Sequence, residues 1–172
     1  MRASGAIVGI VVSLFLAGPQ VVCADDSAEG SAKIFDGSTS VPSLDYTGWA
    51  VSADVGMDSP TISGHVVAAG GTGDSIQVLV LTKSDYQNWK EHLAVNPIYN
   101  SAPAPAADVS VQLPESGTYY VVLSNPSSTL APQTVEGDLT LSWRPSPVAL
   151  SQRQATLDAA KAAARNDHQV QR

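Results

Sequence analysis

The sequence predicts an all-β protein: an antiparallel two-sheet sandwich of seven or eight strands, with one short inserted helix and a C-terminal helical tail. Three observations support this prediction. Residues 49–55 alternate between two faces, one of them apolar, which is the period-two pattern of a half-buried strand. Similar runs, separated by turn residues, recur across residues 33–143. The stretch 113–125 combines a tight corner with a strand that is apolar on both faces, as a central strand requires.

The first half of the predicted sandwich contains four strands. A first strand covers residues 33–41 and is interrupted by a glycine, and a second, more regular one starts at Tyr46. A third covers 62–68 and a buried fourth covers 76–81. The glycine-rich residues 69–75 between them lack the Gly-Lys-Ser/Thr ending and the following helix of a phosphate-binding loop. We therefore interpret them as a hairpin connection.

The second half begins where the β pattern is broken. Residues 82–93 predict a short helix across one end of the sandwich, because they begin with hydroxyl side chains suited to an N-cap. Residues 96–106 are a proline-containing loop, and residues 109–113 are a half-exposed strand. The last strand, over 135–143, has the clearest alternation in the chain and is ended by prolines.

The corner in 113–125 has the pattern of a tyrosine corner. Leu113 precedes Tyr119 by six residues and Gly117 precedes it by two. Pro114 fixes φ and Gly117 tolerates a positive φ, so the chain can turn there at little cost. In such a corner the tyrosine hydroxyl hydrogen-bonds to backbone upstream. Leu113, Gly117 and Tyr119 are therefore predicted structural residues.

The N-terminal segment predicts export. Arg2 precedes an uncharged run over residues 6–18, which is shorter than the roughly 20 residues of a membrane span. Ala24 is a small residue at the expected cleavage position. Cys23 follows valine and so makes a poor lipidation site, although its lipidation is the alternative. Cleavage after Ala24 leaves no cysteine, and hence no disulfide, in a periplasmic or secreted protein without a membrane span.

The charge is strongly uneven along the chain. The formal net charge is −7, and residues 34–143 contain two lysines against eleven acidic residues. An acidic sandwich repels phosphate backbones, so nucleic acid is excluded as its partner. Residues 144–172 are basic and alanine-rich, and a capping box at Ser151 predicts a helix there. The predicted organisation is a signal peptide, a disordered leader, the sandwich domain, and a proline linker with a C-terminal helix, over residues 1–24, 25–32, 33–143 and 144–172.

No pattern in the chain predicts catalysis, a cofactor or a metal. The three histidines have no metal-ligand spacing, and no Gly-x-Ser-x-Gly motif is present. A triad could be assembled from His65, Asp74 and one of many serines, but nothing in the sequence positions them. Asp54, Asp58 and Asp74 lack the dense spacing of a calcium loop and are better explained as turn residues. A hydrolase is therefore the third function considered.

Aromatic residues are the best candidates for a binding surface. Tyr86, Trp89 and Tyr99 fall in the irregular region 82–106, where their rings could stack on a sugar or contact a peptide. The alternative is that Tyr86 and Trp89 cover the open end of the sandwich as core. A solvent-facing Trp89 ring would favour a ligand, and a covered one would favour a protein partner.

Three runs of sequence carry a resemblance to a known group. They are Gly-Asp-Ser-Ile-Gln-Val-Leu-Val-Leu-Thr at 73–82, Asp-Tyr-Gln-Asn-Trp at 85–89, and Leu-Pro-Glu-Ser-Gly-Thr-Tyr-Tyr-Val-Val-Leu-Ser-Asn at 113–125. The chain resembles the jelly-roll sandwiches of bacterial extracytoplasmic proteins related to pre-peptidase C-terminal domains and, more distantly, GOLD domains. The resemblance implies a non-catalytic accessory, ligand-binding or protein-interaction module, and no catalytic residue carries over.

Two functions therefore remain for an exported module. The first is protein–protein interaction or an accessory role in the cell envelope or outside the cell, with an unidentified protein partner. The second is binding of a carbohydrate or small ligand through the aromatic region 82–106. The C-terminal helix is a candidate binding element, unless Leu150 and Leu157 dock it on the sandwich.

Overall fold

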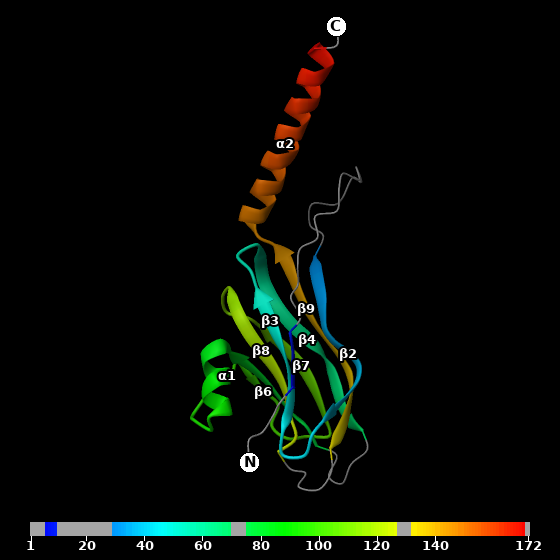
Figure 1. The fold of residues 1–172 in the computed structure, drawn as a ribbon, viewed down its shortest axis with the longest axis vertical. Coiled ribbons are helices and arrows are strands. Elements are labelled where there is room, and N and C mark those ends of the chain that lie inside the picture. Colours follow the sequence, from blue (N-terminus) through cyan, green and yellow to red (C-terminus); the bar gives the residue numbers. More distant parts are fainter. Residues whose placement is uncertain (1–5, 10–28, 70–74, 127–131, 171–172) are drawn as a thin grey trace.

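The computed structural model describes residues 6–9, 29–69, 75–126 and 132–170, with only the backbone described for 6–9 and 166–170. The described chain forms two sheets packed face to face, with one short helix beside them and one long helix extending away (Figure 1). The elements are β1 (Ala6–Gly9), β2 (Gly30–Val41), β3 (Tyr46–Ala53), β4 (Met57–Ala69), β5 (Gln77–Thr82), α1 (Lys83–Lys90), β6 (Tyr99–Asn100), β7 (Ala106–Gln112), β8 (Gly117–Ser124), β9 (Gln133–Pro145) and α2 (Pro147–Val170).

The strands form a five-stranded sheet in the order β1-β3-β8-β5-β6 and a four-stranded sheet in the order β2-β9-β4-β7. Every pairing is antiparallel except that of β1 with β3, which is parallel. The predicted all-β, two-sheet sandwich with an inserted helix and a C-terminal helix is therefore confirmed.

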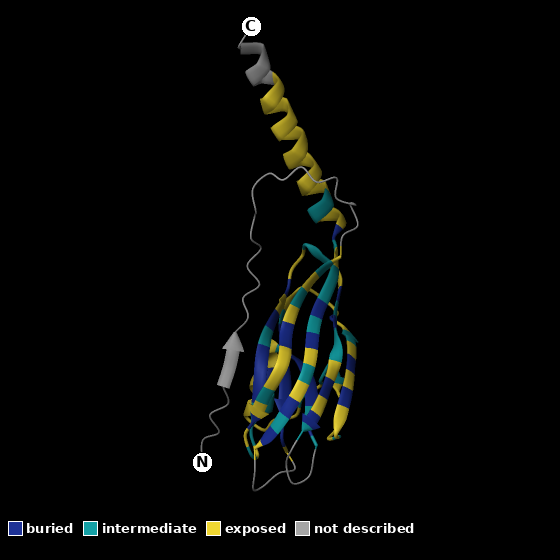
Figure 2. Cartoon of the chain, turned by 90° about the vertical axis from the view of Figure 1, so that its right-hand side faces the viewer, coloured by how far each residue is buried: buried dark blue, intermediate teal, exposed yellow. Residues whose placement is uncertain are grey.

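The main core lies between the two sheets and follows from the period-two alternation of their strands. In β9, Val135, Leu139 and Leu141 are fully buried, whereas the residues between them are more exposed. Figure 2 shows the resulting bands of buried and exposed residues along the strands. Strand β5 is buried on both faces: Val78 and Val80 join the main core, and its leucines belong to a second cluster on the outer face of the sheet.

Several strand boundaries differ from those expected. Strand β2 begins at Gly30, inside the segment predicted as a leader, and continues through the predicted interruption at Gly37. It can do so because Gly37 adopts a φ of 111°, which glycine tolerates, while paired with Gly137 of β9. Strand β4 is also longer than predicted, starting at Met57, and β6 is a two-residue strand inside the predicted loop.

Strands β4 and β9 approach each other closely at two glycines. Gly64 and Gly137 have φ values of 151° and 144°. A Cβ at Gly64 would overlap the carbonyl oxygen of Asp138, and a Cβ at Gly137 would overlap that of His65. The absence of side chains at both positions is therefore required for this pairing.

The tyrosine corner has the hydrogen bond that the sequence predicted. Tyr119 is buried, and its hydroxyl donates to the carbonyl oxygen of Glu115 over 2.7 Å. The same hydroxyl accepts from the Glu115 amide over 3.3 Å. Leu113 is buried beside the corner, where its amide donates to the carbonyl of Pro60 over 2.8 Å. The corner thus ties the loop before β8 to the start of that strand.

Replacing Tyr119 by phenylalanine should destabilise the fold without changing its surface. The variant leaves the Glu115 carbonyl without this partner, and losing such a bond at a largely buried site costs on the order of 1–3 kcal/mol. Urea denaturation of the wild-type and variant proteins measures the difference. An unchanged midpoint would mean that the hydroxyl contributes nothing to stability.

Helix α2 starts earlier than the sequence suggests. The predicted N-cap was Ser151, but the helix begins at Pro147, and the Ser146 hydroxyl accepts the Ala149 amide over 3.2 Å. The prediction was wrong because proline is well suited to the first helical position, where its missing N–H has no helical partner. The Ser151 hydroxyl instead donates to the Pro147 carbonyl over 2.8 Å. Among the described helices, none is both long and apolar enough to cross a membrane.

Candidate functional site

The three predicted aromatic residues lie on two different sides of the five-stranded sheet. Tyr86 and Trp89 belong to α1, which covers the outer face of that sheet, beside β5 and β8. Tyr99, in β6, packs against the main core, and its hydroxyl donates to the carbonyl of Asp108 over 2.8 Å. The predicted surface of three rings is therefore divided, and only Tyr86 and Trp89 lie together.

Helix α1 is held in place by its cap and by Tyr86. The Thr82 hydroxyl accepts the Asp85 amide over 3.1 Å, which caps the first turn. The Tyr86 ring is 3% exposed and stacks on Tyr120 of β8, with centroids 4.0 Å apart and planes 7° apart. Its hydroxyl lies 3.0 Å from that of Tyr46. Burial, and then this hydrogen bond, raise the pKa of Tyr86 well above its usual value.

The Trp89 ring is half-buried at the edge of this cluster. It meets the Tyr46 ring edge-on, with centroids 4.9 Å apart and planes at 77°, and lies at 24° to the Tyr86 ring. Edge-to-face packing of this kind fixes the orientation of an indole. One part of the ring is thus packed on the protein, and another part remains accessible.

The accessible part of Trp89 faces a hollow of about 340 Å³, which we name the Trp89 hollow. Such a volume lies near the lower end of small-ligand pockets, which are about 300–1,000 Å³. The wall combines the indole with charged, amide and hydroxyl side chains. Its residues are Leu44, Asp45, Tyr46, Gln77, Trp89, Lys90, His92, Ser124 and Pro126.

Sequence reasoning found Trp89 but missed most of this wall. Tyr46, Gln77 and Ser124 are far apart in the chain, yet Ser124 is the register partner of both other residues. Only the strand order β3-β8-β5 brings them together. No local pattern in the sequence carries that order, so no signal there could have found the hollow.

Helix α2 forms the second candidate site. All of its residues from Ser151 to Arg165 are exposed, and Leu157 is 49% exposed. The helix extends away from the sandwich in both views (Figures 1 and 2). The helix therefore does not dock on the sandwich through both Leu150 and Leu157. Leu150 is half-buried at the helix base, and Leu157 lies beyond it.

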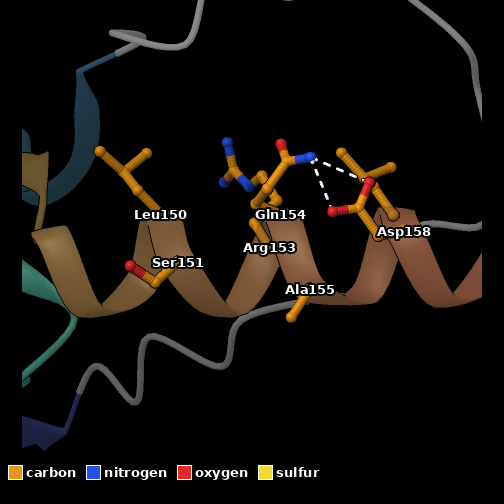
Figure 3. A pocket seen from close by; sticks show the side chains of 7 residues that line it. Leu150, Ser151, Arg153, Gln154, Ala155 and Asp158 are labelled. Atoms are coloured by element: carbon orange, nitrogen blue, oxygen red, sulfur yellow. Dashed lines mark hydrogen bonds between the residues drawn. The ribbon is translucent and has the colours of Figure 1, made fainter.

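One side of α2 has an apolar stripe flanked by basic residues. At 100° per residue, Leu150, Leu157 and Ala164 fall on one narrow stripe, and Arg153 and Lys161 flank it. Figure 3 shows the side chains that line a hollow on this part of the helix, where the Gln154 amide donates to both carboxylate oxygens of Asp158 over 3.0 and 3.1 Å. Its residues are Leu150, Ser151, Arg153, Gln154, Ala155, Leu157 and Asp158.

Removing residues 147–172 should leave the sandwich almost as stable as before. The helix buries little side-chain surface, because residues 151–165 are all exposed. We expect the melting temperature of the truncated protein to lie within a few degrees of that of the full-length mature protein, as measured by circular dichroism. A large decrease would show that α2 belongs to the folded unit.

Other residues were considered for catalysis, metal binding or lipidation. Of these, one histidine is paired with an acidic residue, one is separate, and the rest named here lie outside the described residues. The His65 ring lies 2.7 Å from the Asp108 carboxylate on the exposed face of β4 and β7. His92 is exposed. Within the described ranges, no group of three or more histidine, cysteine or acidic side chains is placed to hold a metal. Asp74, Cys23, Ala24 and the side chain of His168 lie outside the described part of the chain.

Several solved structures are similar to this chain at low sequence identity. A periplasmic inhibitor of g-type lysozyme from Aeromonas hydrophila is 15% identical, with a TM-score of 0.44 over 81% of this chain and 98% of that chain. A chain from the disulfide-linked pili of Bacillus endospore appendages is 13% identical, with a TM-score of 0.42 over 74% and 100%. No protein-family model and no curated protein matches the sequence.

A third similar structure belongs to the predicted group. It is the pre-peptidase C-terminal domain of a collagenase from Bacillus anthracis, 12% identical, with a TM-score of 0.37 over 80% of this chain and 95% of that chain. These similarities concern the fold and assign no role to any residue of the chain.

Proposed function

We propose that the protein is an exported, non-catalytic β-sandwich module that acts by binding another protein, with α2 as its binding element. One observation carries this proposal: α2 presents a stripe of Leu150, Leu157 and Ala164 to solvent, with no part of the sandwich covering it beyond the helix base. Amphipathic helices typically bind by laying such a stripe into an apolar groove.

The composition of the stripe supports a particular kind of partner. Two leucines and an alanine offer a small apolar area, and the flanking Arg153 and Lys161 add positive charge. A groove with an apolar floor and acidic rims complements both features. Because the sandwich is acidic, it repels the acidic surface of a partner. The helix is therefore the element of this chain that best suits an acidic partner.

Site-specific photocrosslinking in the cells that export the protein tests this proposal. A photoreactive amino acid at Leu157 should give a discrete adduct, whereas the same residue at the exposed Ala159, on the opposite side of the helix, should give little. Mass spectrometry then identifies the partner, and its binding to the purified mature protein should be lost on removal of residues 147–172. Equal adducts at both positions, or none, would contradict the proposal.

A second candidate function is binding of a small polar ligand of the carbohydrate class in the Trp89 hollow. The observation that favours it is the combination of a fixed, partly accessible indole with polar groups from Asp45, Gln77 and Lys90. The apolar face of a sugar ring stacks on aromatic rings, and its hydroxyls hydrogen-bond to carboxylate, amide and ammonium groups. Tyr86, being buried, would support the site rather than contact the ligand.

Nuclear magnetic resonance titration tests this second function. Trisaccharides of glucose and of N-acetylglucosamine should shift the Trp89 indole and Gln77 amide resonances saturably. The Gln77→Ala variant should bind more weakly, whereas a control variant, Trp143→Phe on the other sheet, should bind as the wild type does. The carbohydrate function would be wrong if none of these sugars perturbs the hollow.

A further inference from the structure

Strand β3, next to β1 in the five-stranded sheet, is neither charged nor short, unlike each of the strands β2, β6 and β7 at the sheet edges. Its eight residues, Tyr46 to Ala53, are all neutral. Strand β2 contains Lys33 and Asp36, β7 contains Asp108, and β6 is only two residues long. Charged residues and short length are the usual means by which an edge strand avoids pairing with another chain. Strand β3 has neither protection.

The free side of β3 already accepts a strand in this structure. Along one side β3 pairs over its whole length with β8. Along the other side it pairs in parallel with β1, whose four residues run in register from Ala6 opposite Thr47 to Gly9 opposite Ala50. The edge is therefore accessible, and its geometry suits an extended backbone.

Strand β1 lies inside the segment that we predict to be the signal peptide. Cleavage after Ala24, which is part of the proposed export, would remove Ala6–Gly9 and leave one side of β3 without a pairing partner. The backbone N–H and C=O groups that face this side would then depend on water for their hydrogen bonds.

We infer that, in the mature protein, the β3 edge binds an extended, uncharged segment of another polypeptide, which adds a strand to the five-stranded sheet. This inference rests on the export component of the proposed function, and it goes beyond the role proposed for α2. The binding energy comes from main-chain hydrogen bonds, and the selectivity comes from alternate side chains of the added strand.

The surroundings of β3 define the residues that the segment must carry. On the core side, Trp49 packs against Phe35 of β2, with ring centroids 5.1 Å apart. Side chains of an added strand on that side would meet these rings, so β-branched apolar residues are favoured there. On the outer side, Gly48, Ala50 and Ser52 are small and leave the edge unobstructed.

The partner segment is therefore a short run of residues that is apolar at every second position. It contains no charged residue, no proline and no bulky side chain on the outer side. The segment that occupies the edge here, Ala-Ile-Val-Gly, fits this description. A peptide containing it is consequently a suitable probe for the mature protein.

The experiment uses the mature chain from Asp25 and a synthetic peptide of residues 4–11 followed by a lysine tail. Hydrogen exchange and peptide fluorescence anisotropy measure binding. We expect saturable binding that protects those amides among Thr47 to Ala50 that do not face β8, and that leaves α1 and α2 unchanged. Two further peptides are methylated at alternate backbone nitrogens, one at odd and one at even positions. Only one of them should lose binding, because alternate N–H groups face β3.

Variants of the mature chain provide the matched comparison. Ala50→Lys places a charge on the edge and should abolish peptide binding. Ser110→Lys makes the same charge change on β7, and should leave binding unchanged. The inference would be overturned by equal losses in both variants, by binding to both methylated peptides, or by no saturable protection.

Two measurements separate this inference from its premises. Intact-mass analysis of the exported protein establishes whether it starts at Asp25; an uncleaved chain would remove the basis for an open edge. Size-exclusion chromatography with light scattering gives the oligomeric state. A dimer in which the Thr47 to Ala50 amides that face away from β8 are protected without peptide would assign the edge to a second copy of the chain, and would also overturn the inference.

Discussion

Replacing Gly137 by alanine should cause a large loss of stability. At this position φ is 144°, and a Cβ would overlap the carbonyl oxygen of His65 on the neighbouring strand. Backbone strain of this kind alone costs about 1–3 kcal/mol. The overlap adds to it, because it involves backbone rather than a flexible side chain, so β4 and β9 must separate locally.

Urea denaturation of the two proteins measures this effect, with hydrogen exchange locating it. We expect a large decrease in the midpoint and faster exchange in β4 and β9. Gly56→Ala is the matched control, since the closest atom to its added Cβ would be the Ala149 Cβ at an ordinary 3.8 Å. If the two variants were equally stable, the close approach at Gly137 would not constrain the fold.

Replacing Tyr86 by alanine should have the second large effect, and it should act mainly on α1. The ring is buried between the helix and the sheet, stacked on Tyr120 at 4.0 Å. Removing a large buried aromatic side chain typically costs about 3–5 kcal/mol. Because Tyr86 also supports Tyr46 and Trp89, the variant should lose the ordered shape of the Trp89 hollow.

Tyr86→Phe separates packing from hydrogen bonding in this cluster. The phenylalanine keeps the stack on Tyr120 and removes only the bond to the Tyr46 hydroxyl, which is worth about 0.5–1.5 kcal/mol. Thermal denaturation should therefore rank wild type, Tyr86→Phe and Tyr86→Ala in decreasing stability. Tryptophan fluorescence should change strongly only in Tyr86→Ala, and an unchanged spectrum there would mean that Trp89 does not depend on Tyr86.

The alternation of side chains made the fold predictable from the sequence. The alternation of each strand is visible within a few consecutive residues. The corner at Tyr119 is equally local, because its residues are separated by only a few positions. Strand ends were less predictable. The continuation of β2 through Gly37 depends on its cross-strand partner Gly137, which is a hundred positions away in the chain and leaves no local trace.

The candidate sites show the same division between local and non-local information. Trp89 and Tyr86 were found because they share one helix face. Tyr99 is only ten residues beyond Trp89, yet it faces the main core, because its register partner on β5 is Val80, which belongs to that core. Gln77 and Ser124 line the Trp89 hollow only because of the strand order. That order is a property of the whole topology and could not be predicted from a local pattern.

The junction between β9 and α2 has a mechanical consequence. Only Ser146 separates the strand from the helix, and its amide is bound to the carbonyl of Gly56 over 2.8 Å. Strand β9 is an inner strand, paired on its two sides with β2 and β4. A tension applied at the far end of α2, about 36 Å from its start, is therefore transmitted along the axis of β9. The hydrogen bonds on both sides are perpendicular to that axis, so they bear the load together in shear rather than opening one after another.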